Sequence, residues 1–392
     1  MALRKAISDV FTPRNSEINE AMYVQRPALE RELSRSLTKN THTLIFGESG
    51  NGKSWLYKKV LSQLGIPYIV ANCANAARKD SLTEEICDSI YEYCTGGAAG
   101  SRDLVESEVL LSAFREFRKN SDLKKIIVLD NLESIFSKPA LMEELANVVI
   151  LLDDVKYAQN NVNFLIVGVP NGVLDYYTKT DHLDSVANRI EELTKISGLT
   201  AGQVAEFISR GFAQLGVSLE ESQRNRISAH TYRVTLGIPQ RVHEYCEALA
   251  YKIEDNSWLY HEDLLPGADQ DWLMKGLRKS YSVIQFHLNS RDTTVARRNQ
   301  VLYVVGKLTR AQFDSGVIDD LIRREFPDTV PQTNMGIGTI LGELSTGDNP
   351  VLCRTEKGKD YYVKDPRYIM CIRMMLYKDP AINKVGKRNF IY

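Results

Sequence analysis

The sequence lacks the features that define several protein classes. Its 392 residues contain no run of about 18 uncharged apolar residues, and the N-terminal stretch has no apolar segment that a secretory signal needs. The six cysteines form no C-x-x-C pair, so neither a disulfide framework nor a zinc knuckle is indicated. The six histidines are isolated and show no metal-ligand spacing. We therefore expect a soluble, cytoplasmic protein with reduced thiols and no membrane partner.

Net charge is also nearly absent, since 49 Lys+Arg oppose 50 Asp+Glu for a formal charge of −1. This average conceals an asymmetry. Residues 354–392 hold ten basic and four acidic residues, a net charge of +6, so residues 1–353, with 39 basic and 46 acidic residues, carry −7. A basic C-terminal end can contact a phosphate backbone, or equally the acidic body of a second subunit.

Short apolar runs alternate with helical patterns in the first half of the chain. The candidate strands are 41–46, 66–71, 125–130, 163–168 and, as the fifth, 193–196. Strands that are apolar throughout and separated by helices indicate a parallel sheet covered on both faces. We therefore predict an α/β domain with a five-stranded parallel sheet over residues 1–199.

The strand signal disappears from Thr200 onward. Helical patterns over 200–211, 219–231 and 239–253 predict a helical lid within residues 200–255. Residues 256–292 are expected to form a linker and a connecting helix, 271–288. In residues 293–392, three helices precede the β-runs 351–354 and 361–364, which is the order of a winged helix-turn-helix.

One motif carries specific chemistry. Residues 47–54, GESGNGKS, match G-x-x-x-x-G-K-[ST] after a strand and before a helix. Glycines at these positions let backbone N–H groups approach phosphate oxygens, Lys53 reaches the β- and γ-phosphates, and Ser54 ligates Mg²⁺. We assign ATP binding to all eight residues of this P-loop: Gly47, Glu48, Ser49, Gly50, Asn51, Gly52, Lys53 and Ser54.

The second half of such a site is an acidic residue at the tip of a buried strand. Asp130 ends the run IIVLD, about 75 residues after the P-loop, and is the predicted second Mg²⁺ residue. A hydrolytic protein usually carries Glu directly after this Asp as a base, but here the residue is Asn131. Glu133 is the nearest carboxylate and is either catalytic or a solvated residue at a helix start. We therefore expect ATP hydrolysis to be slow.

The motifs GESGNGKS, IIVLDNLE, FLIVGVPNG, SVANRIEEL and GIPQRVHEY occur in this order after YVQR at 23–26. Together they resemble an AAA+ ATPase of the AAA-16, origin-recognition-like and STAND-related branch, over residues 15–255. The tail VLCRTEKGKDYYVKDP is similar to the winged helix that ends prokaryotic stand-alone members. The resemblance implies ATP and Mg²⁺ as cofactors, with residues 23–26 flanking the adenine.

The resemblance also implies three further site residues, each with a simpler alternative. Asn171 would be the polar sensor near the γ-phosphate, or else a residue of the Pro-Asn-Gly turn. Arg189 would be an arginine finger supplied to a neighbouring subunit, making a homo-oligomer, or else a surface arginine. Arg241 would be the second sensor arginine, although Gln240 occupies the place directly after the proline and shifts Arg241 by one residue.

The sequence of the C-terminal region does not decide whether its partner is DNA or protein. The candidate recognition helix, 334–344, contains no Arg or Lys and one Glu, whereas the residues after it interleave basic side chains with tyrosines. We favour a nucleotide-dependent oligomeric switch that regulates a partner effector protein, and the resemblance alone suggests prokaryotic anti-phage or mobile-element defence. The alternatives are a DNA-associated loader or initiator, and a hydrolysis-poor ATP-dependent scaffold.

Overall fold

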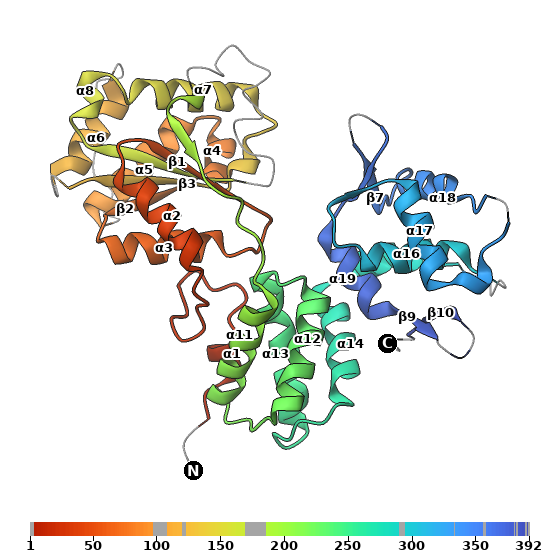
Figure 1. Ribbon diagram of the computed structural model, residues 1–392. Coiled ribbons are helices and arrows are strands. Elements are labelled where there is room, and N and C mark those ends of the chain that lie inside the picture. Colours follow the sequence, from red (N-terminus) through yellow and green to blue (C-terminus); the bar gives the residue numbers. More distant parts are fainter. Residues whose placement is uncertain are drawn as a thin grey trace. The chain divides into compact units, whose positions relative to one another are not determined.

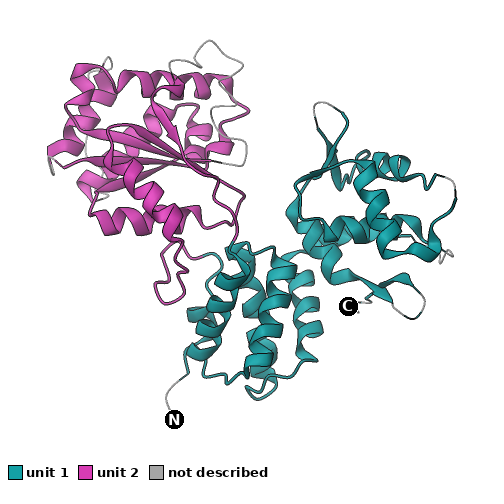
Figure 2. Ribbon diagram, viewed as in Figure 1, with its two compact units in different colours: residues 1–14, 199–392 teal, residues 15–198 magenta. Residues whose placement is uncertain are grey.

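The computed structural model describes residues 4–96, 108–119, 123–168, 186–289, 295–332, 334–355, 358–379, 381, 383–388 and 390. The chain forms two compact units (Figure 2). Residues 15–198 form one, here called the sheet unit, and residues 1–14 with 199–392 form the other, the helical unit. Within the described residues, no helix is long and apolar enough to cross a membrane. All six cysteines are free thiols.

The sheet unit is built on five parallel strands, which confirms the predicted fold class. They are β1 (His42–Phe46), β2 (Tyr68–Asn72), β3 (Lys125–Asp130), β4 (Val162–Gly168) and β5 (Ile190–Glu192). Their order is β2-β3-β4-β1-β5. The P-loop follows β1 and Asp130 ends β3, so both lie at the carboxyl edge of the sheet, where ligands bind in open α/β folds.

Alternate strand residues enter two separate cores, as the two-residue period of a strand requires. Ile126 and Val128 pack with α2 (Pro27–Thr38) and α3 (Lys53–Leu64) on one face, whereas Ile127 and Leu129 pack on the other. Figure 1 shows α2 and α3 on one side of the sheet and α7 on the other. The helices of that second face are α4 (Cys73–Lys79), α5 (Leu82–Thr95), α6 (Val109–Lys119) and α7 (Pro139–Leu151), followed by the short α8 (Val155–Ala158). Both faces are therefore covered, as predicted.

The position of the fifth strand was predicted wrongly. Regular pairing with β1 is confined to Ile190–Glu192, and not to residues 193–196. Leu193 N and Ile196 N still donate to the carbonyls of Leu44 and Phe46, at 3.0 and 2.8 Å. The apolar run therefore follows β1 without forming a regular ladder, because only some of its N–H groups face the strand.

The helical unit begins with α1 (Ile7–Val10), whose neighbour Phe11 packs against Phe207 and Phe212 with ring centroids 5.8 and 5.5 Å apart. The three predicted helices after residue 200 are α11 (Ala201–Gln214), α12 (Glu221–Thr235) and α13 (Pro239–Asp255). The predicted connecting helix is instead two helices, α14 (Leu264–Gly276) and α15 (Arg278–His287). The earlier start at Leu264 is possible because Pro266 lies in the first turn, where its missing N–H has no helical acceptor.

The C-terminal part of this unit has the predicted order of three helices followed by a hairpin. The helices are α16 (Arg297–Lys307), α17 (Ser315–Glu325) and α18 (Ile337–Leu344), with the short turn η3 (Pro327–Thr329) before the last. Strands β6 (Gln312–Phe313), β7 (Leu352–Arg354) and β8 (Tyr361–Val363) form an antiparallel sheet in the order β6-β8-β7. The chain continues into α19 (Pro366–Met375) and the hairpin of β9 (Leu376–Asp379) and β10 (Lys384–Lys387).

Candidate nucleotide site

The P-loop connects β1 to α3, and the backbone geometry explains why Gly47 and Gly52 carry no side chain. A Cβ on Gly47 would lie 2.4 Å from the carbonyl oxygen of Ile196, so the backbones approach too closely for any side chain. Gly52 has φ +77°, a left-handed conformation that glycine adopts without strain. Gly52 is also the N-cap of α3 and offers no side chain to the first turn. The first N–H groups of α3 therefore remain available for an anion.

Lys53 is the first residue of α3, and its side chain folds back over the loop. Its Nζ donates to the carbonyl oxygens of Gly47 and Glu48, at 2.8 and 3.2 Å. Burial lowers the pKa of the Lys53 ammonium, and the carboxylates of Glu133 and Asp130 oppose that shift. The ammonium therefore lies within the field of both predicted acidic residues, and phosphate oxygens would take the place of the loop carbonyls.

Asp130 has a buried partner on α3, Tyr57. The Tyr57 hydroxyl lies 3.3 Å from Asp130 Oδ2. Ser54 is the second residue of α3, three residues before Tyr57. The carboxylate of Asp130 and the hydroxyl of Ser54 suit Mg²⁺, which prefers oxygen ligands and takes few of them from protein. Within the described residues, no group of three or more His, Cys, Asp or Glu forms an alternative metal cluster.

The side chain of Arg26 hydrogen-bonds to the backbone of the P-loop. Its buried guanidinium donates from Nη1 to the carbonyl of Asn51 at 2.9 Å and from Nη2 to that of Gly52 at 3.3 Å. Asn51 Nδ2 donates in turn to the carbonyl of Ile196 at 2.9 Å. The loop is therefore fixed on two sides, and residues 196–197, at the end of the sheet unit, form one of them. The sequence placed Arg26 beside the adenine and did not indicate these contacts.

Comparison with known proteins identifies the fold of the sheet unit. A family model described as an AAA domain matches residues 36–176. A solved Walker-type ATPase of Pyrococcus abyssi is similar at TM-score 0.55 and 16% identity, over 93% of this chain and 99% of that chain. The Aeropyrum pernix ORC2 protein is similar at TM-score 0.50 in its ADP form, with 13% identity over 93% and 96% of the two chains. In ADPNP-ADP complexes it is similar at TM-score 0.50 and 14% identity, over 88% and 92%. No curated protein matches the chain.

The sheet unit has the P-loop AAA+ fold. The residue that follows Asp130 at the carboxyl edge of the sheet is Asn131, with φ +58°. Asn131 N donates to Asp130 Oδ1 at 2.8 Å, and its Nδ2 donates to Asn72 Oδ1 at 3.2 Å. Glu133, in the turn η2 (Leu132–Ser134), is exposed. The AAA+ sheet therefore presents an amide where a base is usual.

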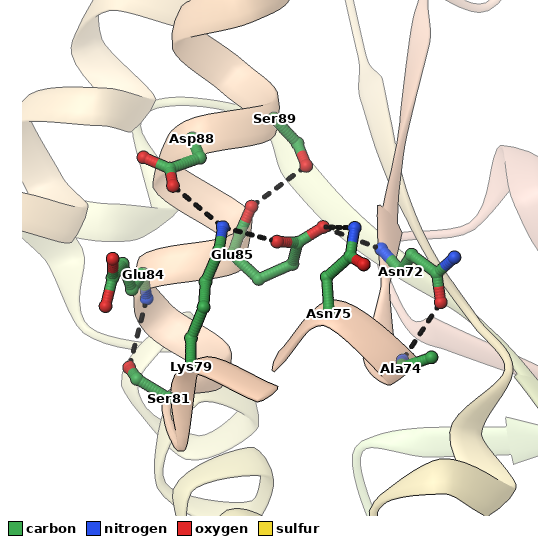
Figure 3. A network of polar contacts seen from close by, with 9 residues as sticks. All are labelled: Asn72, Ala74, Asn75, Lys79, Ser81, Glu84, Glu85, Asp88 and Ser89. Carbon is green, nitrogen blue, oxygen red and sulfur yellow. Dashed lines mark hydrogen bonds and ion pairs between the residues drawn. The ribbon is translucent and has the colours of Figure 1, made fainter. Parts of the chain in front are cut away.

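Asn72 belongs to a buried polar network that the sequence did not indicate (Figure 3). Glu85, only 5% exposed, accepts from the backbone N of Asn72 at 3.2 Å and from Asn75 Nδ2 at 3.3 Å. Lys79 Nζ binds Glu85 Oε2 at 2.6 Å and Asp88 at 2.7 Å. Since Asn72 Oδ1 also caps α4 through Ala74 N, the tip of β2 is held rigidly beside Asp130, its partner in the strand register. The pairing of Asn72 with Asp130 in the register of β2 and β3 would have identified Asn72 as a residue of this edge.

The remaining predicted residues that the structure describes bind carboxylates of their own units. Arg189 is in the turn before β5, where its Nε binds Asp153 at 2.6 Å. Arg241 is in the first turn of α13 and binds both oxygens of Glu244, at 2.9 and 2.7 Å. Gln240 Nε2 reaches the same carboxylate at 3.1 Å. Asn171 lies outside the described residues.

Proposed function

We propose that the protein binds ATP with Mg²⁺ at the P-loop and uses the bound nucleotide as a switch. The observation that supports this most directly is the convergence of the open N-terminus of α3, Lys53, Ser54 and Asp130 at one edge of the AAA+ sheet. Backbone N–H groups and Lys53 would hold the phosphates. Ser54 and Asp130 would hold Mg²⁺, which neutralises charge that develops on the phosphates.

Slow hydrolysis is part of this proposal. Asn131 cannot accept a proton from an attacking water, and its amide is engaged with Asn72. Glu133 is two residues further on and exposed, so it is the only nearby alternative base that the predicted set offers. A long-lived ATP state suits a switch or an ATP-dependent scaffold better than a motor.

We further propose that the ATP state favours assembly with a second copy. Arg189 O accepts from His42 N at the start of β1, whereas the P-loop begins after the end of β1. The strand spans five residues, about 15 Å, so Arg189 cannot reach the phosphates bound by its own P-loop. A role for Arg189 as an arginine finger therefore requires a neighbouring subunit.

The winged-helix-like C-terminal elements would carry the output, and we propose protein contact as their main role. α18 contributes no basic side chain, and Glu343 on it pairs with Arg298. Several basic residues of the tail are also engaged within the unit: Arg373 with the carbonyl of Gly306, Lys378 with that of Glu325, and Arg388 with Asp269. DNA binding is the second candidate, supported by the net charge of +6 over residues 354–392.

The deciding experiment measures ATP binding by calorimetry for the full chain and for Lys53→Ala. We expect the variant to lose binding by about 100-fold or more, because Lys53 is the only positively charged residue of the P-loop sequence, residues 47–54. Lys59→Ala is the matched control, since Lys59 lies on the same helix but pairs with Glu20 at 2.7 Å. Retained affinity in Lys53→Ala would overturn the site assignment. Particle mass with and without ATP and Mg²⁺ then tests assembly.

A further inference from the structure

Tyr57 is a buried residue beside Asp130, one of the two predicted Mg²⁺ ligands. It lies one turn after Ser54 on α3, and its side chain is 1% exposed, between α3 and the sheet. Its ring packs edge-on against Tyr68 of β2 at 6.3 Å between centroids. Its hydroxyl lies 3.3 Å from Asp130 Oδ2. A phenylalanine would fill the same space, so the hydroxyl itself needs an explanation.

The direction of this hydrogen bond follows from the protons available. An ionised carboxylate only accepts hydrogen bonds, so the Tyr57 hydroxyl must donate to Asp130 Oδ2.

This hydrogen bond has a consequence for metal binding. The Asp130 carboxylate is held at both oxygens, since its Oδ1 accepts from Asn131 N at 2.8 Å and its Oδ2 accepts from Tyr57 at 3.3 Å. One lone pair on each carboxylate oxygen remains for the cation or its water.

We propose that Tyr57 is a positioning residue for Mg²⁺, which orients the Asp130 carboxylate through its own hydroxyl. It touches neither the phosphates nor the cation. The proposal rests on ATP binding at the P-loop, which is the proposed function. Loss of the Tyr57 hydroxyl should therefore weaken the response to Mg²⁺ and leave the metal-free affinity for ATP unchanged.

The test measures the affinity for ATP in full-length Tyr57→Phe, first with EDTA and then across a Mg²⁺ titration. We expect the affinity in EDTA to stay within twofold of the parent. The Mg²⁺ concentration that produces half of the change in ATP affinity, here called the Mg²⁺ midpoint, should rise about 3- to 10-fold. This is the fold-change expected from the loss of one hydrogen bond. Tyr68→Phe is the matched control, because Tyr68 contacts the same ring from β2, and it should change neither quantity.

A double variant separates positioning from packing. In the Asp130→Ala background, Tyr57→Phe should shift the Mg²⁺ midpoint by less than half of its effect in the parent, since the carboxylate that Tyr57 orients is already gone. The proposal would be overturned if Tyr57→Phe left the Mg²⁺ midpoint unchanged, or if it reduced the affinity for ATP equally in EDTA and in Mg²⁺. Failure of the proposed function would look different, because the parent itself would then bind no ATP.

Discussion

The side-chain amide of Asn131 donates to Asn72 Oδ1 at 3.2 Å, so two amides face each other at the carboxyl ends of β3 and β2. Asn131 has φ +58°, which Asn tolerates better than most residues. The position beside Asp130 is therefore occupied by a group that fits the backbone and cannot act as a base. This pair explains why ATP binding and ATP hydrolysis need separate tests.

Substitution of Asn131 by Glu should raise the rate of ATP hydrolysis at least tenfold, because a general base contributes about 100-fold or more when well placed. Asn131→Gln is the matched control, since it has the same length and the same left-handed backbone strain but no base. The measurement is phosphate release at saturating ATP and Mg²⁺. Equal rates in the two variants, or rapid hydrolysis by the parent, would contradict the role given to Asn131.

Most of the sheet was predictable from the sequence, because strands buried on both faces are apolar throughout. Lys125–Asp130 was predicted with its observed bounds, and the P-loop is a contiguous motif whose function depends on local backbone. Tyr57 was missed because an aromatic residue on a helix that packs against a sheet is usually an ordinary core residue, and the sequence does not show where its hydroxyl lies. Asn72 was missed because the second strand was predicted to end at Ala71, one residue too early. Both depend on contacts between segments, which spacing does not reveal.

Arg189 should act on a neighbouring subunit, and complementation tests this directly. Lys53→Ala and Arg189→Ala are each expected to lack ATP hydrolysis as pure proteins. In a mixture, a subunit with an intact P-loop can receive Arg189 from a Lys53→Ala neighbour, so part of the activity should return. The measurement is hydrolysis as a function of mixing ratio. Full activity of pure Arg189→Ala would leave Arg189 as a structural partner of Asp153.

Asp269 should be important for the stability of the helical unit. It is fully buried and accepts from Tyr245 at 3.0 Å, from Arg388 at 3.1 Å, and lies 2.7 Å from His230 Nε2. Asp269→Asn should lower the free energy of unfolding by about 3 kcal/mol, since breaking a buried charged network leaves its partners uncompensated. Asp271→Asn is the control on the same helix. Its pair with Lys252 is partly exposed, so we expect a loss of less than about 1 kcal/mol. Calorimetric melting distinguishes the two.

Two buried histidines predict how stability changes with pH. Burial lowers the pKa of His42 to about 4 and that of His243 to about 3. Each accepts a backbone hydrogen bond at Nδ1, from Phe164 N and Thr12 N respectively, both at 3.0 Å. The unfolded chain binds these protons near pH 6.5, whereas the folded chain does not. Stability is therefore fully present above pH 6.5 and falls as the pH is lowered.

The loss should reach about 1.4 kcal/mol per pH unit for each histidine between pH 6 and the folded pKa. His243→Gln keeps a possible acceptor for Thr12 N but does not titrate. It should be less stable at pH 7 and should show a smaller fall in melting temperature between pH 7 and pH 5 than the parent. An identical pH dependence in both proteins would mean that His243 is not the group that takes up the proton.

Substitutions in the C-terminal tail can distinguish DNA binding from protein contact, provided that the substituted residues are free to contact DNA. Arg388 binds Asp269, so its replacement would alter stability first. Within the described residues, the side chains of Lys359, Lys364 and Lys384 have no hydrogen-bonded or ion-paired partner. If DNA is the partner, replacing all three with Ala should reduce the slope of log affinity against log salt by about 3, roughly one unit for each phosphate contact. If the tail contacts protein, the full-length parent should show no salt-dependent binding to a DNA duplex at low salt, and the triple variant should behave identically.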